Sequence, residues 1–139
     1  MSDEANPLDA SHCFVCGPNN SLGLKVEFQL RDNGVCVGEF TPGEAHQGAD
    51  GVTHGGILYC LLDDVMANLL WLKGEPCVTA RCEVRYRDAL PIGTPVRLEG
   101  ALLKRRGRLA EMEAKVIRQD DDAVVAEASA RFMVLPSEA

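Results

Sequence analysis

Residues 55–72 constrain the fold most, because they are apolar on nearly every side. An uninterrupted apolar stretch of this length favours an α-helix over a strand. A helix without a polar face has to be buried all round, so the rest of the chain must form an envelope for it. Lys73-Gly74 then supply a cation and a helix stop. The apolar positions are Ile57, Leu58, Leu61, Leu62, Val65, Met66, Leu69, Leu70, Trp71 and Leu72.

Most of the remaining sequence alternates apolar and polar residues, the period-two pattern of strands that are buried on one face. Turn-forming residues separate these stretches, notably Asp32-Asn33-Gly34 and Arg106-Gly107. Strands joined by hairpins pair antiparallel, so the order ββ–α–ββββ predicts an α+β fold in which one long antiparallel β-sheet wraps around one central α-helix. The expected strands are 24–30, 35–40, 78–86, 95–104, 108–118 and 123–135.

A length of 139 residues fits one domain with a sizeable core and is too short for two ordinary domains. We expect residues 13–139 to form that domain and residues 1–12 to be a flexible lead. The lead is acidic and has no apolar stretch, unlike a secretion signal or a transit peptide. Asp63 and Asp64 interrupt the longest apolar run, which excludes it as a membrane span. These features predict a cytoplasmic protein.

The charge of the chain is negative but unevenly distributed. There are 14 Lys and Arg against 21 Asp and Glu, a net charge of −7, which argues against a nucleic-acid-binding surface. Residues 81–108, however, contain eight basic and three acidic side chains, a local charge of +5. A positive region on an acidic protein is a feature that its function has to explain.

Six cysteines in a chain of this length are too few for a disulfide scaffold. Cys13 and Cys16 form a C-x-x-C pair, a spacing found in zinc sites and in thiol–disulfide sites. Only His12 lies nearby in the sequence, so the ligand set of a structural zinc site is incomplete, and no βαβ pattern of the thioredoxin type follows. We therefore expect no metal and interpret the pair as free thiols in a tight turn.

Two adjacent carboxylates, Asp63 and Asp64, lie within the otherwise apolar helix, with Asn68 one turn further on. A buried unpaired carboxylate is costly, so these acids either reach solvent or an oligomer interface, or carry chemistry. His54-Gly55-Gly56 come just before them, at the helix start. Glycine lets a ligand approach the backbone, and the first N–H groups of a helix are free donors. Such donors suit a carbonyl oxygen that becomes negative during attack.

His54-Gly55-Gly56 followed by Leu61-Leu62-Asp63 resembles the H-G-G-x-x-x-x-L-x-[DE] signature of hot-dog-fold acyl-CoA thioesterases of the PaaI-like (phenylacetate-pathway) type. The likeness includes Cys13-Phe14-Val15-Cys16-Gly17 and Thr79-Ala80-Arg81, and it covers about residues 12–135. It implies a hot-dog fold and hydrolysis of an acyl- or aryl-CoA thioester, with coenzyme A present only as part of the substrate. It also implies a homodimer, often paired into a tetramer, with active sites at the subunit interface.

The resemblance further implies roles for residues at the helix start. The N–H of Gly55 or Gly56 polarises the thioester carbonyl, Asp63 is the general base or the nucleophile, and His54 is a loop-structuring donor rather than a catalyst. At about 100° per residue, Asp63 lies half a turn from His54 around the helix. One helix therefore need not supply both the glycine N–H and the acid to one site, and a neighbouring subunit could bring its own acid.

Two further positions match the family less closely. Gln47 would help to hold the carbonyl or the water, although its loop is one residue longer than in relatives. Thr79 falls where some relatives have a water-orienting Ser. Alternation along residues 78–86 nevertheless turns Thr79 outward together with Arg81, away from the helix.

The basic residues that follow the helix are candidates for binding the phosphates of coenzyme A. They are Arg85 and Arg87 in the first strand after the helix, and Lys104, Arg105 and Arg106 at a hairpin tip. The same charges could instead protect an exposed strand from aggregation.

Two other functions remain compatible with the sequence. A hot-dog dehydratase or hydratase would use His46 or His54 together with Asp63, and a non-catalytic acyl-CoA-binding domain would keep the fold without the chemistry. The Gly-Gly helix start and the acid nine residues after His54 favour the thioesterase.

Overall fold

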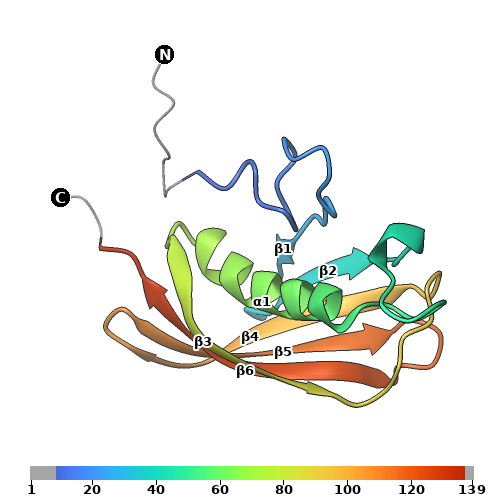
Figure 1. Ribbon diagram of the computed structural model, residues 1–139. Coiled ribbons are helices and arrows are strands. Elements are labelled where there is room, and N and C mark those ends of the chain that lie inside the picture. Colours follow the sequence, from blue (N-terminus) through green and yellow to red (C-terminus); the bar gives the residue numbers. More distant parts are fainter. Residues whose placement is uncertain (1–8, 137–139) are drawn as a thin grey trace.

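The computed structural model of the protein describes residues 9–136, and residues 1–8 of the expected lead lie outside this range. One helix, α1, lies across one face of a six-stranded antiparallel sheet that curves around it (Figure 1), so the predicted architecture and element order are confirmed. Among the described residues, no helix is long and apolar enough to cross a membrane. The elements are β1 (Gln29–Leu30), β2 (Cys36–Phe40), the 3-10 helix η1 (Glu44–His46), α1 (Gly55–Trp71), β3 (Cys77–Tyr86), β4 (Val96–Arg106), β5 (Leu109–Arg118) and β6 (Val124–Val134).

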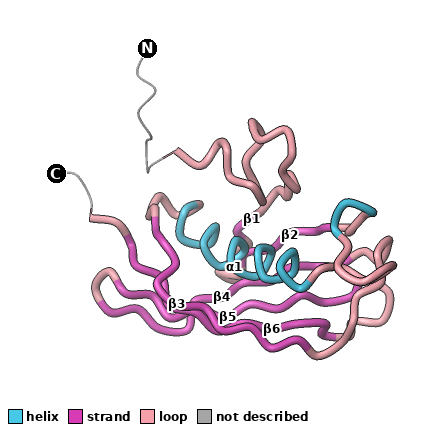
Figure 2. Tube along the Cα trace, in the orientation of Figure 1, coloured by secondary structure: helices cyan, strands magenta, loops and turns pink. Residues whose placement is uncertain are grey.

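The strand order in the sheet is β1-β2-β4-β5-β6-β3. β3 precedes β4 in the chain but joins the sheet at its far edge, where it pairs with β6 (Figure 2). A pairing of β3 with β4 through a simple hairpin is therefore not formed. As a result β3 has, among the described residues, one hydrogen-bonded neighbouring strand and one open edge.

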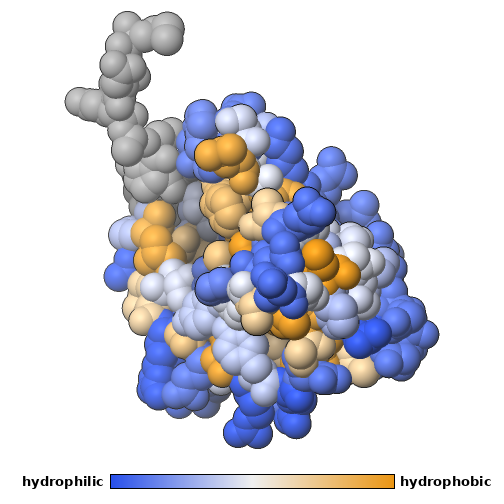
Figure 3. Space-filling view, turned by 45° about the vertical axis from the view of Figure 1, so that its right-hand side comes forward, coloured by the Kyte–Doolittle hydropathy of each residue, from blue (hydrophilic) through white to orange (hydrophobic). Residues whose placement is uncertain are grey.

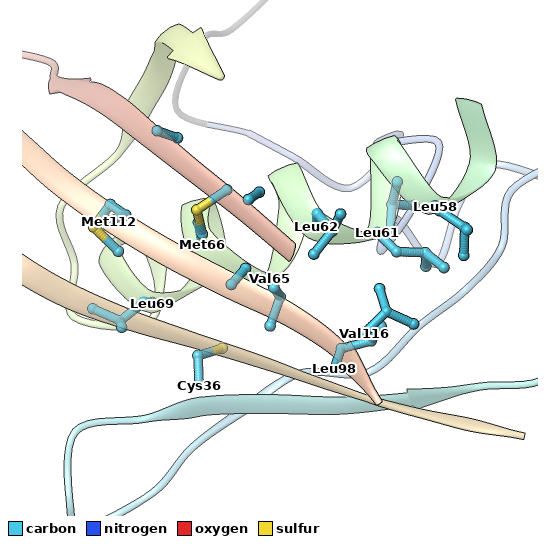
Figure 4. Packing of buried hydrophobic residues seen from close by; sticks show 14 of the residues in the cluster. Cys36, Leu58, Leu61, Leu62, Val65, Met66, Leu69, Leu98, Met112 and Val116 are labelled. Atoms are coloured by element: carbon cyan, nitrogen blue, oxygen red, sulfur yellow. The ribbon is translucent and has the colours of Figure 1, made fainter. Parts of the chain in front are cut away.

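The core forms between the inner face of the sheet and α1. Figure 4 shows Leu62, Val65 and Met66 of α1 pointing toward the strands, and all three are fully buried. Gly100 in β4 allows the close approach of the helix, because a Cβ there would lie 2.9 Å from the Val65 carbonyl oxygen. The predicted helix is thus confirmed for Gly55–Trp71, but the expectation that it is buried all round is wrong, since Tyr59 is 38% exposed and Leu72, just after the helix, is 48% exposed.

The prediction of a strand over residues 24–30 is wrong for most of its length, because only Gln29–Leu30 pair with β2. Lys25 has a φ of 55°, which breaks the extended conformation. The N–H groups of Leu24 and Val26 donate instead to the carbonyl oxygens of residues 14–15. The alternation here therefore reflects side chains that pack into or against the core, Val26 within it and Leu24 and Phe28 against it, while the backbone is bonded to the N-terminal segment instead of the sheet.

The register of β3 against β6 shifts between Thr79 and Arg81, which places a β-bulge at Ala80. A bulge inserts one residue and so reverses the alternation of side chains beyond it. Cys77 is accordingly 5% exposed and Val78 is 52% exposed, the reverse of simple alternation. Thr79 turns toward α1, so its predicted outward orientation is wrong.

Candidate active site

One side of α1 faces β3 and makes three hydrogen bonds to it. The residues of α1 involved are spaced four apart, so they lie one above another on the same side of the helix. As the chain proceeds along α1, the contacted residues of β3 have decreasing numbers, so the helix runs antiparallel to the strand. The three contacts are Tyr86 Oη to the Gly55 carbonyl oxygen at 2.8 Å, Tyr59 Oη to the Cys82 carbonyl oxygen at 2.9 Å, and Thr79 Oγ1 to Asp63 Oδ1 at 2.7 Å.

Asp63 is held in a fixed orientation on this side of the helix. Burial raises the pKa of its carboxyl group, and the hydrogen bond from Thr79 partly offsets that rise. The Thr79 hydroxyl thus touches the acid that the family pattern assigns to catalysis, which only the bulge in β3 makes possible. An oriented carboxylate with reduced solvation is suited to accept a proton from water.

His54 is the N-cap of α1, and its Nδ1 accepts a hydrogen bond from the Gly56 N–H at 2.8 Å. His54 therefore structures the helix start as an acceptor, not as the donor that was expected. The bond occupies the Gly56 N–H, whereas the Gly55 N–H finds no acceptor within the described part of the chain. Of the two predicted carbonyl-polarising groups, Gly55 is the one available to a ligand.

Gln47 lies in the loop before α1, where both ends of its amide group bind the loop itself. Its Oε1 accepts from the Gly51 N–H at 2.6 Å, and its Nε2 donates to the Glu44 carbonyl oxygen at 2.9 Å. A direct role of Gln47 in binding a substrate would require these bonds to be exchanged.

Gly55 and Asp63 lie on the same side of α1, because eight residues turn the helix by about 80° beyond two full turns. The expected half turn applies to His54, the residue before the helix. Eight residues separate them along the helix, a rise of about 12 Å. This separation exceeds the reach of one thioester group. Within one chain, therefore, the free N–H and the acid do not serve the same carbonyl.

Tyr59 and Tyr86 belong to this arrangement but were not singled out from the sequence. Their hydroxyl groups join α1 to β3 near the middle and at the C-terminal end of the strand. The i, i+4 spacing of Gly55, Tyr59 and Asp63 was the available signal, because it predicts one shared side of the helix.

His46 and His54, the histidines that a dehydratase could use, make hydrogen bonds within the loop and at the helix start. His46 Nδ1 accepts from the Gly43 N–H at 2.9 Å, and its ring lies 5.2 Å from that of Phe40. His54 caps α1. Within the described residues neither histidine makes a hydrogen bond to Asp63.

Two of the predicted phosphate-binding arginines, Arg85 in β3 and Arg87 just after it, lie on the face of the sheet opposite α1. Arg87 forms an ion pair with Glu127. Arg85 lines a hollow of about 720 Å³ on that outer face, together with Glu113 and Lys115. Arg85 and Arg87 are therefore not brought together with Asp63 in this chain.

The tip of the β4–β5 hairpin lies near the C-terminal end of α1. Arg105 contacts Glu75 there, at 2.6 Å, and this ion pair raises the pKa of the guanidinium and lowers that of the carboxyl group. Lys104 and Arg106 line a smaller hollow of about 240 Å³. The basic side chains of residues 81–108 are thus divided between the outer face of the sheet and the tip of the β4–β5 hairpin.

Residues 50–132 match the model of a family described as thioesterase superfamily. The chain is 29% identical over 104 residues to acyl-coenzyme A thioesterase THEM5 of Mus musculus, and 31% identical over 102 residues to acyl-coenzyme A thioesterase THEM4 of Xenopus laevis. These matches cover 75% and 73% of this chain but 41% and 45% of the relatives. The chain thus spans less than half the length of these two proteins.

Solved structures share the fold. RHA08564, a thioesterase superfamily protein, has a TM-score of 0.83 at 26% identity, over 96% of this chain and 72% of its own. PaaI from the phenylacetic acid degradation operon of E. coli has a TM-score of 0.75 at 17% identity, over 82% of each chain. A hypothetical thioesterase of Streptococcus pneumoniae TIGR4, solved with coenzyme A, has a TM-score of 0.75 at 20% identity, over 82% of this chain and 91% of its own. The hot-dog fold and the PaaI-like resemblance are confirmed, and because the family model matches more than half of the chain, the protein belongs to the thioesterase superfamily.

Proposed function

We propose that this protein hydrolyses the thioester of an acyl- or aryl-CoA at an interface between two copies of the chain. The observation that carries the proposal is the position of the free Gly55 N–H and of Asp63 on one side of α1, beside the open edge of β3. Membership of the superfamily, the activity named for the THEM4 and THEM5 relatives, and the coenzyme A of the Streptococcus structure support the substrate class.

The open edge of β3 has the character of a protein interface. Val78 and Tyr86 of β3 are 52% and 48% exposed, and Tyr59 of α1 is 38% exposed beside them. Figure 3 shows one face of the molecule, on which several separate apolar areas lie among polar ones. An edge strand with exposed apolar side chains is prone to pair with another strand, and a second copy of β3 would satisfy it.

The contacts of Tyr59 indicate how two copies would meet. Tyr59 is the midpoint between Gly55 and Asp63, and its hydroxyl binds Cys82 near the middle of β3. A two-fold axis near Cys82 would pair β3 antiparallel with its copy and lay the two α1 helices side by side in opposite directions. Gly55 of one subunit would then lie level with Asp63 of the partner subunit.

In this arrangement the Gly55 N–H donates to the thioester carbonyl oxygen and stabilises its developing negative charge. Asp63 of the partner subunit takes a proton from water, which attacks the carbonyl carbon, or attacks that carbon itself before water hydrolyses the resulting anhydride. In either route the C–S bond breaks, coenzyme A leaves as the thiol, and the acyl group leaves as the carboxylic acid.

A panel of aryl-, short-chain and long-chain acyl-CoAs tests the proposal through the release of free thiol. We expect at least one ester to be cleaved well above the uncatalysed rate. All six cysteines are unpaired and four of them are only half-buried, so each assay needs a blank with protein and no ester to correct for reaction of the thiol reagent with the protein. Hydrolysis of every ester at the background rate would refute the thioesterase proposal.

The hairpin tip provides a second test, since we propose that it holds the phosphates of coenzyme A. Arg105→Ala and Arg106→Ala should raise KM for an acyl-CoA several-fold, because an exposed arginine–phosphate contact contributes about 1 kcal/mol. KM for a thioester that lacks the nucleotide should stay constant. Arg118→Ala is the matched control, because Arg118 is likewise ion-paired but lies at the other end of β5. An equal rise in KM for both esters would remove the tip from the coenzyme A site.

A further inference from the structure

A second group of chemically active side chains lies where α1 contacts the N-terminal segment. Cys13 Sγ, Cys16 Sγ and a carboxylate oxygen of Asp64 lie within 4.8 Å of one another, and all three residues are half-buried. Cys13 Sγ is 3.5 Å from Asp64 Oδ1. The C-x-x-C pair, which lacks further ligands nearby in the sequence, gains its third donor from the helix.

We propose that Cys13, Cys16 and Asp64 form a metal-binding site for a thiophilic divalent cation, zinc above all, which fastens the N-terminal segment to α1. This site is separate from the proposed thioesterase site. Asp63 makes its hydrogen bond to Thr79 of β3, whereas the neighbouring Asp64 contacts Cys13 of the N-terminal segment. The inference therefore does not depend on the proposed hydrolysis.

The separation of two of the three donor atoms suits tetrahedral zinc, and the third lies within 4.8 Å of both. Bond lengths of about 2.3 Å to sulfur and about 2.1 Å to oxygen place the ligand atoms of such a site about 3.6–3.8 Å apart. The 3.5 Å between Cys13 Sγ and Asp64 Oδ1 agrees with this separation. Two thiolates select zinc over magnesium or calcium, and a water molecule would complete the coordination.

The surroundings hold two of the donors in place. Asn68 Nδ2 donates to Asp64 Oδ2 at 3.0 Å and lies 3.7 Å from Cys16 Sγ, so it orients a ligand from each segment, as residues around metal ligands commonly do. Gly17 N–H donates to the Cys13 carbonyl oxygen at 2.8 Å and closes the turn. A Cβ at Gly17 would lie 2.3 Å from the Cys13 nitrogen, so this tight turn requires glycine.

The cluster also lacks a compensating positive charge. Within residues 9–136, Asp64 forms no ion pair, and the side chain of His12 lies against Ser11 instead. A divalent cation would supply the missing positive charge.

The test measures metal binding by the full-length protein, freed of any affinity tag and kept reduced. Dialysis against zinc followed by elemental analysis should give one zinc per chain. Cobalt should give the visible absorption of a tetrahedral site together with a thiolate charge-transfer band. Cys13→Ser and Cys16→Ser should abolish both signals. Asp64→Asn should weaken zinc binding by at least about 10-fold, because even loss of a residue that is hydrogen-bonded to a metal ligand costs about 10- to 100-fold in affinity.

Cys82→Ser is the matched control, because Cys82 is also half-buried but lies in β3, outside the cluster. It should keep full zinc binding and the cobalt spectrum. Circular dichroism of each variant shows whether the fold persists. Asp64→Asn is the mildest of these changes, because asparagine has the shape of aspartate. The proposal is overturned if the reduced wild-type protein takes up no zinc, or if the Cys13→Ser and Cys16→Ser variants bind zinc as tightly as Cys82→Ser. A Cys13–Cys16 disulfide with no metal uptake after reduction would also overturn it.

Discussion

Replacing Asp63 by Asn should lower kcat for thioester hydrolysis about 10²- to 10⁴-fold, the usual contribution of a general base. Asn has the shape of Asp and its amide oxygen can still accept the hydrogen bond from Thr79, so the helix and β3 should stay in place. What is lost is the ability to take a proton from water or to attack the thioester. Because the acid acts in the chemical step, KM should change far less than kcat.

Thiol release from the best ester of the panel measures this effect, and circular dichroism and thermal unfolding verify the fold. Asp64→Asn is the informative comparison, since it removes the adjacent carboxylate, which does not face β3. If Asp64→Asn lowered kcat strongly while Asp63→Asn did not, the assignment of the catalytic acid would be wrong.

Gly55→Pro should lower kcat about 10²- to 10³-fold, because it removes the one N–H that we propose stabilises the carbonyl oxygen. Proline is tolerated at the first position of a helix, where its missing N–H breaks no helical bond. His54 has φ −61° and ψ 133°, a conformation that a residue before proline readily adopts. The substitution therefore removes a donor and preserves the helix start.

Gly55→Ala separates the loss of the donor from the loss of space. Alanine keeps the N–H, and its Cβ would lie 3.5 Å from the Tyr86 ring, an ordinary contact. We expect Gly55→Ala to lose much less activity than Gly55→Pro. Equal losses in both variants would show that room at this position, and not the N–H, is what the reaction needs.

Mixing the two inactive variants tests whether the site is shared between subunits. A hybrid dimer of Asp63→Asn and Gly55→Pro chains contains one site with both native groups and one site with neither. Random exchange of equal amounts makes half of the dimers hybrid, so about a quarter of the wild-type activity should return. If both groups acted within one chain, every site would lack one of them and no activity would return.

The main features of the fold follow from local sequence patterns. The continuous apolar run predicts a buried helix, and the period-two stretches predict β2 and β4–β6 closely, because each pattern records burial on one or all sides of an element. The first strand fails for the same reason. Leu24 and Val26 alternate with polar residues because their side chains face the core, although their backbone is bonded to the N-terminal segment. Periodicity indicates which side chains are buried, but not which segments pair.

The candidate site was predictable only in part. The motif around His54, Gly55 and Asp63 indicates the chemistry, because helix-start N–H groups and a buried acid have few other uses together. The motif does not indicate that His54 accepts a hydrogen bond from the Gly56 N–H, nor that the Gln47 side chain is hydrogen-bonded within its own loop. Those hydrogen bonds depend on the path of the loop, which no local propensity determines.

By itself the sequence determined one helix, its envelope of strands, the acid on the helix and the family to which the chain belongs. Only the tertiary structure decided that β3 lies at the open edge, that a bulge turns Thr79 onto Asp63, and that Asp64 meets Cys13 and Cys16. The physical reason is that periodicity and propensity act over a few neighbouring residues. Strand order, register and contacts between distant segments are instead set by how the whole chain buries its apolar surface.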